Sequence, residues 1–202
     1  MSDLSLEASL KRDGYQCVAG VDEAGRGPLA GPVVVAAVVM PESWPDDVPL
    51  DDSKKLSPRQ REAAFEAIRK NSRGYRIKVV PPGEIDRLNI LAATLAGMAR
   101  ALEELVPRPD MALVDGNSLP RVSMECRAIV GGDGISHSIA AASILAKVVR
   151  DRIMAAYGRL YPGWGFDRHK GYPTRDHREA VLKLGRSPIH RLSFRVRGLD
   201  GP

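Results

Sequence analysis

Four acidic residues of this chain stand where short apolar segments end. Asp22 and Glu23 end the first such segment. Asp115 ends a later one, and Asp133 follows a third. Carboxylates that meet at one place repel one another unless cations neutralise them, and hard divalent cations such as Mg²⁺ and Mn²⁺ prefer carboxylate and water oxygens. Because a pair of such cations can hydrolyse a phosphodiester, these residues predict a metal-dependent phosphoryl-ester hydrolase.

Each acid taken alone also has a structural explanation. Asp22 and Glu23 alternate faces of a strand, and both could be turn residues. Asp115 precedes a glycine, which is typical of a turn, and Asp133 lies near a helix start, where an acid is typical of a cap. Their joint placement at strand ends is what favours a metal site. No histidine except His137 lies beside them, and no cysteine pairs with them, which disfavours zinc.

The predicted elements explain how acids far apart in the sequence could meet. The sequence predicts strands at 17–22, 33–40, 75–80, 111–114 and 126–130. It predicts helices at 57–70, 82–105, 136–157 and 174–184, with a loop at 158–173. This order is typical of an α/β fold with a mixed sheet covered by helices. In such folds, binding sites gather at strand ends.

Basic residues are concentrated in the C-terminal quarter of the sequence. The chain has 202 residues, with 30 Lys+Arg, 25 Asp+Glu and a formal net charge of +5. Residues 150–202 hold 12 Lys/Arg and 5 Asp/Glu, a net +7, so residues 1–149 carry a net −2. This asymmetry favours a polyanionic partner, although a solvated basic tail would carry the same charge. Together with the carboxylates, it points to a nucleic-acid phosphodiester.

The composition is that of a soluble globular protein. The hydrophobic fraction of 44% and the charged fraction of 27% exclude wholesale disorder. The longest apolar run, residues 33–40, is far shorter than the roughly 18–20 residues of a membrane span. Residues 1–13 are polar, unlike a secretory signal. Cys17 and Cys126 are too few for a disulfide scaffold and are predicted to be buried free thiols, so we expect a cytoplasmic protein without membrane contact.

A glycine-rich turn, Gly25-Arg26-Gly27, connects the first two predicted strands. It does not match a dinucleotide-binding turn, because Pro28 and then a strand follow it, and no Walker A motif is present. Glycines on both sides of an arginine let backbone amides come close to a ligand. A plain turn remains the other interpretation.

Several segments together resemble bacterial ribonuclease HII. They are residues 20–32, 52–57, 114–116, 132–148, 169–172 and 187–194. They occur in the family's order with family-like spacing over about residues 17–195. The resemblance implies a ribonuclease H-like fold with a central five-stranded mixed sheet and a helical C-terminal part. We expect a lead at 1–16, a catalytic core at 17–157 and a basic helical part at 158–202 packed on the core as a single domain.

The resemblance also implies an activity. It implies endonucleolytic hydrolysis of the RNA strand of RNA/DNA hybrids, and cutting 5′ of single ribonucleotides embedded in duplex DNA. The products would be a 3′-hydroxyl and a 5′-phosphate, with two Mn²⁺ or Mg²⁺ ions as cofactors and a role in removing ribonucleotides from DNA. The protein is expected to be a monomer. The sequence end, RVRGLDGP, has no evident apolar clamp-binding motif, so recruitment by a sliding clamp is not predicted.

The resemblance assigns roles to named residues of this chain. The family's four metal-binding acids correspond to Asp22, Glu23, Asp115 and Asp133. The turn that reads the 2′-hydroxyl through backbone contacts corresponds to Gly25, Arg26 and Gly27.

Three further residues are expected at the substrate. Tyr172 matches the tyrosine that stacks against a deoxyribose at the RNA–DNA junction. Ser143 and Lys147, four residues apart on one helix, could hold phosphate oxygens, or could be a packing residue and a solvated lysine. Pro173 stands where the family often has glycine, which puts the orientation of Tyr172 in question.

An alternative function is a non-catalytic module that binds RNA/DNA hybrids. Such a module would keep the basic surface and would not depend on a metal. Four carboxylates beside phosphates would repel its ligand, so the acids favour the enzyme. Histidines 169, 177 and 190 are interpreted as structural or phosphate-facing residues rather than metal ligands.

Overall fold

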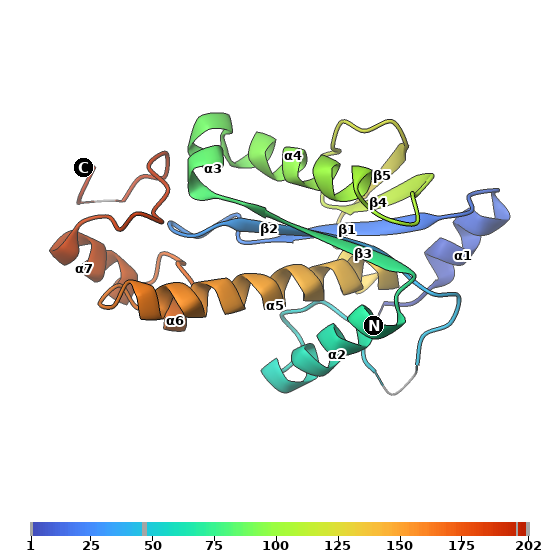
Figure 1. Cartoon of the computed structure of the whole chain (residues 1–202), viewed down its shortest axis with the longest axis horizontal. Coiled ribbons are helices and arrows are strands. Elements are labelled where there is room, and N and C mark those ends of the chain that lie inside the picture. The colour runs from blue at the N-terminus through green and yellow to red at the C-terminus, as the bar shows by residue number, and fades with distance from the viewer. Residues whose placement is uncertain (1, 46–47, 197, 201–202) are drawn as a thin grey trace.

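A five-stranded sheet forms the centre of the computed structural model, which describes residues 2–45, 48–196 and 198–200 (Figure 1). The strands are β1 (Val18–Ala24), β2 (Val33–Val39), β3 (Gly74–Val80), β4 (Met111–Asp115) and β5 (Glu125–Ile129). Their order across the sheet is β3-β2-β1-β4-β5. β1 pairs antiparallel with β2, and β2 with β3, whereas β1–β4 and β4–β5 are parallel. The predicted mixed sheet is therefore confirmed.

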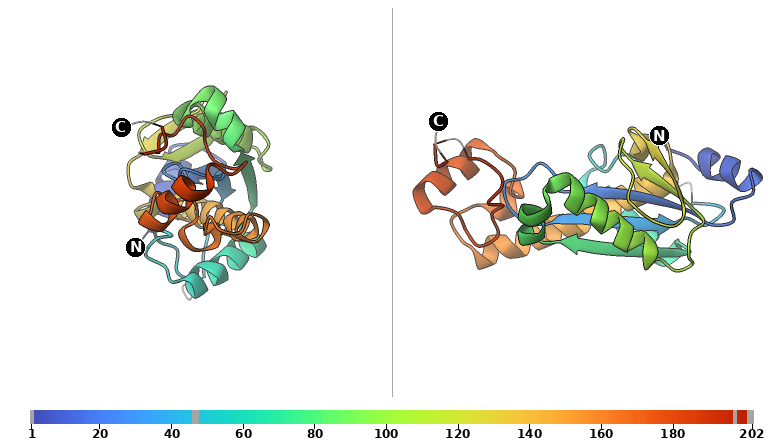
Figure 2. Two further views of the ribbon diagram at one scale, coloured as in Figure 1. Left: turned by 90° about the vertical axis from the view of Figure 1, so that its left-hand side faces the viewer. Right: turned by 90° about the horizontal axis from the view of Figure 1, so that it is seen from above.

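Helices cover both faces of this sheet. They are α1 (Ser5–Arg12), α2 (Pro58–Asn71), α3 (Pro82–Leu88), α4 (Ile90–Glu103), α5 (His137–Leu160), α6 (Phe166–His169) and α7 (Arg175–Leu184), with a 3₁₀ turn, η1 (Gly132–Gly134). α3 and α4 lie on one face of the sheet, and α5 lies on the other with α2 beyond it (Figure 1). α1 lies at one end of the elongated molecule and α6–α7 at the other (Figure 2).

The sequence of β2 explains this layered arrangement. All seven of its residues are valine or alanine, and all are buried. Alternate side chains of a strand face opposite sides of the sheet. Val35 therefore packs in one core cluster with Met98 of α4, whereas Ala36 packs in another with Ala141 of α5. A strand covered on both faces needs an unbroken apolar run.

The close contact between α5 and β1 depends on a glycine. A Cβ atom added to Gly20 of β1 would lie 2.1 Å from the backbone carbon of Ser138 at the start of α5. The small residues at this end of α5, such as Ala140, are fully buried. This close approach places the start of α5 beside β1, the strand that carries Asp22.

Four details of the predicted elements were wrong. The helix expected at 82–105 is two helices, because Asn89 has a φ of 71° and its side chain accepts the N–H of Ala92 as the cap of α4. The loop expected at 158–173 contains α6, and α5 continues into it as far as Leu160. Cys17 is buried as expected, but Cys126 is half-buried because β5 is an edge strand.

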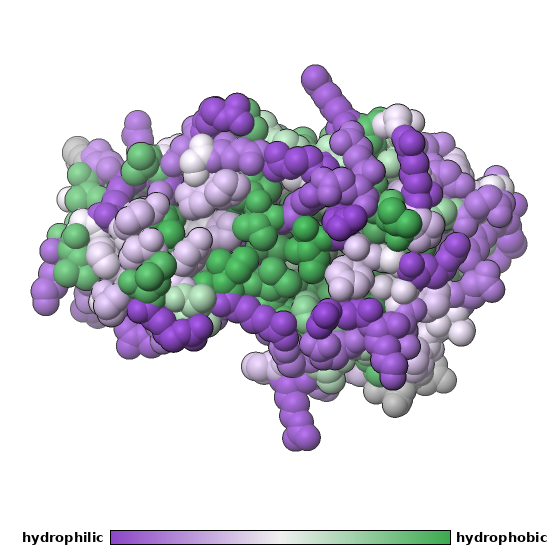
Figure 3. Space-filling model, viewed as in Figure 1, coloured by the Kyte–Doolittle hydropathy of each residue, from purple (hydrophilic) through white to green (hydrophobic). Residues whose placement is uncertain are grey.

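β3 forms the other edge of the sheet. Hydrophobic surface is visible in the middle of the face around β3 and α5, and hydrophilic residues surround it (Figure 3). Arg76 and Lys78 of β3 both pair with Glu104. Charged side chains on an edge strand oppose pairing with a second sheet.

Among the described residues, no helix is long and apolar enough to cross a membrane.

Candidate active site

One cavity of about 210 Å³ gathers most of the predicted site residues. It is lined by Asp22, Glu23, Ala24, Gly25, Ser53, Lys54, Asp115, Asp133, Ser143, Lys147 and Tyr172. Of the predicted residues, Arg26 and Gly27 are not in its lining, although both belong to the adjoining turn. The cavity thus brings together segments that are separated by up to 150 residues of sequence.

Parallel strands place the acids at one edge of the sheet. Val21 of β1 is in register with Val114 of β4. The next residues, Asp22 and Asp115, therefore lie side by side where the pairing of β1 with β4 ends, and the carboxyl ends of parallel strands form binding sites. Asp133 lies in η1, just before α5.

Burial and like charge act on these carboxyl groups. Asp22 is 5% exposed, and burial, followed by the negative charges of Glu23 and Asp115, raises its pKa well above the usual value. Burial also raises the pKa of Glu23. The pKa of Asp133 is raised by burial and then by the nearby charge of Asp52. Such mutual repulsion is the condition that a bound cation relieves.

The donor chemistry of this cavity suits hard divalent cations. Its acidic side chains offer oxygen ligands, which Mg²⁺ and Mn²⁺ prefer. Asp22 Oδ1 accepts the Glu23 N–H at 2.6 Å, and Asp115 Oδ1 accepts the Gly132 N–H at 2.8 Å. Within residues 2–45, 48–196 and 198–200, no three Asp, Glu, His or Cys side chains are placed so that they could already hold a metal ion. Binding would therefore require the carboxylates to turn toward a common point.

A buried serine pair lies beside Asp22. Ser143 Oγ donates to Ser53 Oγ at 3.1 Å, and both serines line the cavity together with Asp22. Both serines are buried. The sequence left Ser143 open between a phosphate contact and a packing residue, and it did not single out Ser53, whose signal was its position inside the Asp52–Ser57 segment.

Two lysines add positive charge to the cavity. Burial disfavours the charge on Lys54, but the nearby carboxylates, Asp52 foremost, raise its pKa overall. Lys147 pairs with Asp151 at 2.9 Å. Both lysines line the cavity, so both face the region where an anionic substrate would lie.

A buried arginine fixes the Gly-Arg-Gly turn. Arg191 is 1% exposed and donates to the carbonyl oxygens of Gly25, Arg26 and Gly31 at 2.5, 2.8 and 3.0 Å. Gly25 has a φ of 101°, a conformation that favours glycine. The turn is therefore held from inside the protein by a residue of the C-terminal segment.

A second buried arginine joins this region to Tyr172. Arg150 is 1% exposed, and it donates to the carbonyl oxygens of Pro32 at 3.0 Å and Lys170 at 3.0 Å. Its guanidinium carbon lies 5.8 Å from the centre of the Tyr172 ring. The interpretation of the C-terminal basic residues as a surface was wrong for Arg150 and Arg191, because both are buried and serve backbone carbonyls. The sequence signal for the burial of Arg150 was its spacing, because it follows Ala142 and Ala146 at four-residue steps on the buried face of α5.

Tyr172 lies beside the Gly-Arg-Gly turn, and His177 contacts its backbone carbonyl. The residue is 42% exposed, and a Cβ atom on Gly27 would lie 3.8 Å from its ring. The Ser187 N–H donates to His190 Nδ1 at 2.8 Å, so the neutral His190 ring carries its hydrogen on Nε2. That hydrogen faces His177 Nε2 at 3.1 Å, and His177 Nδ1 then donates to the Tyr172 carbonyl at 2.9 Å. The structural role expected for these two histidines is confirmed.

This histidine pair leads to a prediction about acid stability. Burial lowers the pKa of both His177 and His190 to about 4, whereas a histidine in the unfolded chain protonates near about 6.5. The unfolded state therefore binds more protons between these values, and stability present above pH 6.5 is lost as the pH falls to about 4. We expect the free energy of unfolding to fall by at most about 1.4 kcal/mol per pH unit for each ring.

Urea unfolding across this pH range tests the prediction. A His177→Gln/His190→Gln double variant should show a shallower fall in unfolding free energy than the wild type. The cavity carboxylates, whose raised pKa values act in the opposite direction, are common to both proteins and cancel in the comparison. Equal slopes for the two proteins would contradict the assignment.

The fold and the site together define an α/β nuclease of the ribonuclease H-like class. Its mixed sheet has acids at the ends of two parallel strands under a long helix. The solved ribonuclease H2 from Pyrococcus horikoshii OT3 matches with a TM-score of 0.77 and 29% identity, over 90% of this chain and 95% of that one. A ribonuclease HII from Archaeoglobus fulgidus, solved in a complex with PCNA, matches with a TM-score of 0.75 and 30% identity, over 92% of this chain and 99% of that one.

Sequence comparisons narrow the class to one family. A family model described as ribonuclease HII matches residues 19–197. Ribonuclease HII from Geobacter sulfurreducens is 52% identical over 191 residues, which cover 94% of this chain and 87% of that protein. The chain belongs to the ribonuclease HII family, and it is an endonuclease of the ribonuclease H type. The predicted family, fold class and enzyme class are confirmed.

Proposed function

We propose that this chain hydrolyses the RNA strand of RNA/DNA hybrids and cuts 5′ of single ribonucleotides embedded in duplex DNA. The products would be a 3′-hydroxyl and a 5′-phosphate. One observation carries this proposal: a single cavity contains four carboxylates together with Gly25 and Tyr172. Chemistry and recognition of the sugar would therefore occur at neighbouring positions.

The carboxylates would serve the chemical step. Asp22, Glu23, Asp115 and Asp133 would hold two Mn²⁺ or Mg²⁺ ions, which supply an activated water and stabilisation of the leaving oxygen when bound. The protein's own contribution is to hold these acids together against their repulsion. The sheet register fixes Asp22 beside Asp115, and the Glu23 N–H donates to the Asp22 carboxylate.

The Gly-Arg-Gly turn and Tyr172 would recognise the sugars. Backbone groups of Gly25, Arg26 and Gly27 would contact the 2′-hydroxyl, the group that distinguishes RNA from DNA. The adjacent Tyr172 ring would pack against a sugar that lacks this hydroxyl, and so would mark the RNA–DNA junction. Because Arg191 holds the carbonyls of the turn, the turn can present a fixed surface to the sugar.

The phosphates would be held by basic residues. Lys147 and Ser143 line the cavity and would contact phosphate oxygens near the cut. Exposed basic residues of the C-terminal part would extend this contact along the duplex; they include Arg168, Arg175, Arg178 and Lys183. Affinity should then fall as salt concentration rises, since binding releases counterions from the nucleic acid.

A cleavage assay tests the proposal against a non-catalytic binding module. Duplex DNA carrying one ribonucleotide is incubated with and without Mn²⁺, and the strand lengths are read on a denaturing gel. We expect one cut on the 5′ side of the ribonucleotide, with Mn²⁺ only, and no cut in an all-DNA duplex of the same sequence. Binding of the substrate without any cut in Mn²⁺ or Mg²⁺ would instead support the module.

A further inference from the structure

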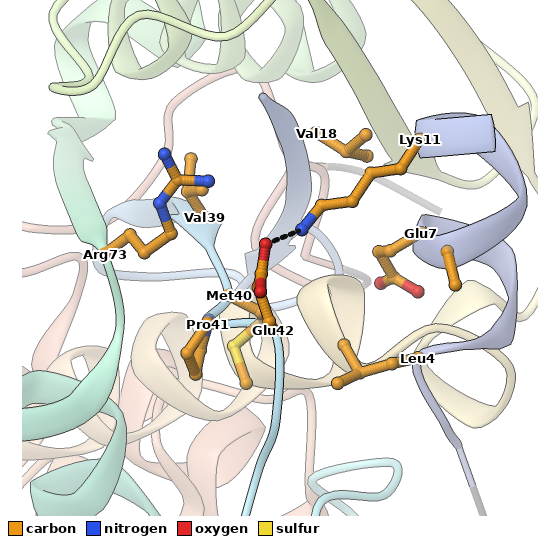
Figure 4. Close-up of a pocket in the computed structure, with 10 residues that line it drawn as sticks. Leu4, Glu7, Lys11, Val18, Val39, Met40, Pro41, Glu42 and Arg73 are labelled. Carbon is orange, nitrogen blue, oxygen red and sulfur yellow. Dashed lines mark hydrogen bonds and ion pairs between the residues drawn. The ribbon is translucent and has the colours of Figure 1, made fainter. Parts of the chain in front are cut away.

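The N-terminal lead places a buried acid close to the candidate site. α1 precedes the residues matched by the family model, which begin at 19. Glu7 of α1 is 5% exposed. Figure 4 shows it beside a cavity between α1 and the ends of β1 and β2, where Lys11 pairs with Glu42. Burying a carboxylate is unfavourable unless hydrogen-bond donors satisfy it. The donors that contact Glu7 therefore indicate its role in the structure.

Glu7 is bound by the start of α5. Its Oε1 accepts hydrogen bonds from Ser136 Oγ at 2.6 Å, Ser138 Oγ at 2.6 Å and the Ser138 N–H at 2.9 Å. Ser136 is the N-cap of α5, and its Oγ also accepts the Ile139 N–H. A negative charge at this end of a helix is favourable, because the unpaired N–H groups carry partial positive charge. Glu7 therefore ties α1 to the first turn of α5.

The same turn carries Asp133. The Ser136 N–H donates to the Gly132 carbonyl at 2.8 Å, which closes the turn around Asp133. The Gly132 N–H in turn donates to Asp115 Oδ1 at 2.8 Å. The turn is thus held by one carboxylate where it begins, Asp115, and by another where it ends, Glu7.

Backbone contacts with the lead reinforce this arrangement. The Asp3 N–H donates to the Ile135 carbonyl at 3.2 Å, and the His137 N–H donates to the Asp3 carbonyl at 2.9 Å. These bonds run on both sides of Ser136. The lead therefore follows the segment between Asp133 and α5 and fixes its path from the side away from the cavity.

We propose that Glu7 is a positioning residue for Asp133. It holds the exit of the turn so that the Asp133 carboxylate stays at the cavity with Asp22 and Asp115. The inference rests on the proposed role of Asp133 as a metal ligand. It extends the working site to a residue that neither touches the substrate nor lies in the segments that resemble the family.

A double-mutant cycle tests this inference in the full chain. The variants are Glu7→Ala, Asp133→Ala and the two combined; alanine is chosen because glutamine would keep an oxygen that accepts the three hydrogen bonds. Mn²⁺ affinity is measured by calorimetry without substrate, and cleavage of the single-ribonucleotide duplex is measured alongside. We expect Glu7→Ala to weaken Mn²⁺ binding about 10- to 100-fold, the range found when residues that orient ligands are changed. In the Asp133→Ala background, Glu7→Ala should cause no further loss, because the residue acts through Asp133.

Matched variants separate positioning from a loss of stability. Ile68 of α2 is fully buried and packs in a different core cluster from α1. Ile68→Ala should lower the melting temperature while keeping wild-type Mn²⁺ affinity. If Glu7→Ala fails to fold, Ser138→Ala replaces it, since it removes one of the three donors and keeps the backbone N–H.

The outcomes distinguish this inference from the proposed function. Equal losses from Glu7→Ala with and without Asp133, or wild-type Mn²⁺ affinity in Glu7→Ala, would overturn the positioning role and leave the proposed function intact. If Asp133→Ala itself keeps wild-type Mn²⁺ affinity and cleavage, the proposed role of Asp133 fails, and the role of Glu7 fails with it.

Discussion

Replacing Asp22 with asparagine is expected to lower cleavage at least about a thousandfold, or about 4 kcal/mol of activation free energy. Asparagine keeps an oxygen that can accept the hydrogen bond from the Glu23 N–H, so the local structure should survive. It removes the most buried charge of the cavity, and with it a metal ligand. Steady-state cleavage of the single-ribonucleotide duplex in Mn²⁺ measures the loss.

The same substitution should raise the melting temperature of the metal-free protein. Burial and repulsion raise the pKa of Asp22 in the fold, so its ionised form destabilises the folded state at neutral pH. Asp110→Asn is the matched control, because Asp110 accepts the N–H groups of Gln16 and Cys17 outside the cavity. That variant should lose stability and keep its activity. Turnover of Asp22→Asn at the wild-type rate would refute the mechanism.

Replacing Arg191 with methionine is expected to destabilise the protein by about 3 kcal/mol or more. The carbonyls of Gly25, Arg26 and Gly31 would each lose a buried donor, and each unsatisfied group costs about 1–3 kcal/mol. The turn would also lose its fixed conformation. Chemical denaturation measures the stability, and the ratio of cleavage on ribonucleotide-containing duplex to all-DNA duplex measures the loss of sugar recognition.

Arg195→Met is the matched control for this prediction. Arg195 is exposed and lies four residues further along the chain. The substitution removes the same charge without touching the turn. It should weaken duplex binding slightly at low salt and leave stability unchanged. Similar stability losses in both variants would show that Arg191 acts through its charge rather than through its three carbonyl contacts.

Strand ends and apolar periodicity were sufficient to predict most of the sheet and the position of the acids. An apolar run followed by Asp22 and Glu23 is visible in one sequence, although β1 continues through both acids to Ala24 and pairs with β2 along that length. Most of the predicted site residues line one cavity. Their roles as ligands and substrate contacts remain predictions, because the acids in the described ranges do not already form a metal-holding group.

The features that sequence reasoning missed depend on contacts between distant segments. Counting charge assigned Arg150 and Arg191 to the surface, since a charged side chain is rarely buried without a partner. Their partners are backbone carbonyls, which every sequence contains and no motif marks. Asn89 stood inside a continuous helical pattern, so the break at its positive φ was not visible. Glu7 belonged to a polar lead whose partners lie about 130 residues further along the chain.

The span of the Arg191 contacts has a consequence for the order of events during synthesis. Arg191 binds the Gly31 carbonyl across 160 residues of chain. At a ribosomal rate of about 5–20 residues per second, the turn is made roughly 10–30 s before the arginine that holds it. Asp22, Asp115 and Asp133 all precede Arg191 in the chain. A nascent chain would therefore have its carboxylates before the turn proposed to read the sugar is fixed, and the two would be joined only when the segment containing Arg191 has folded.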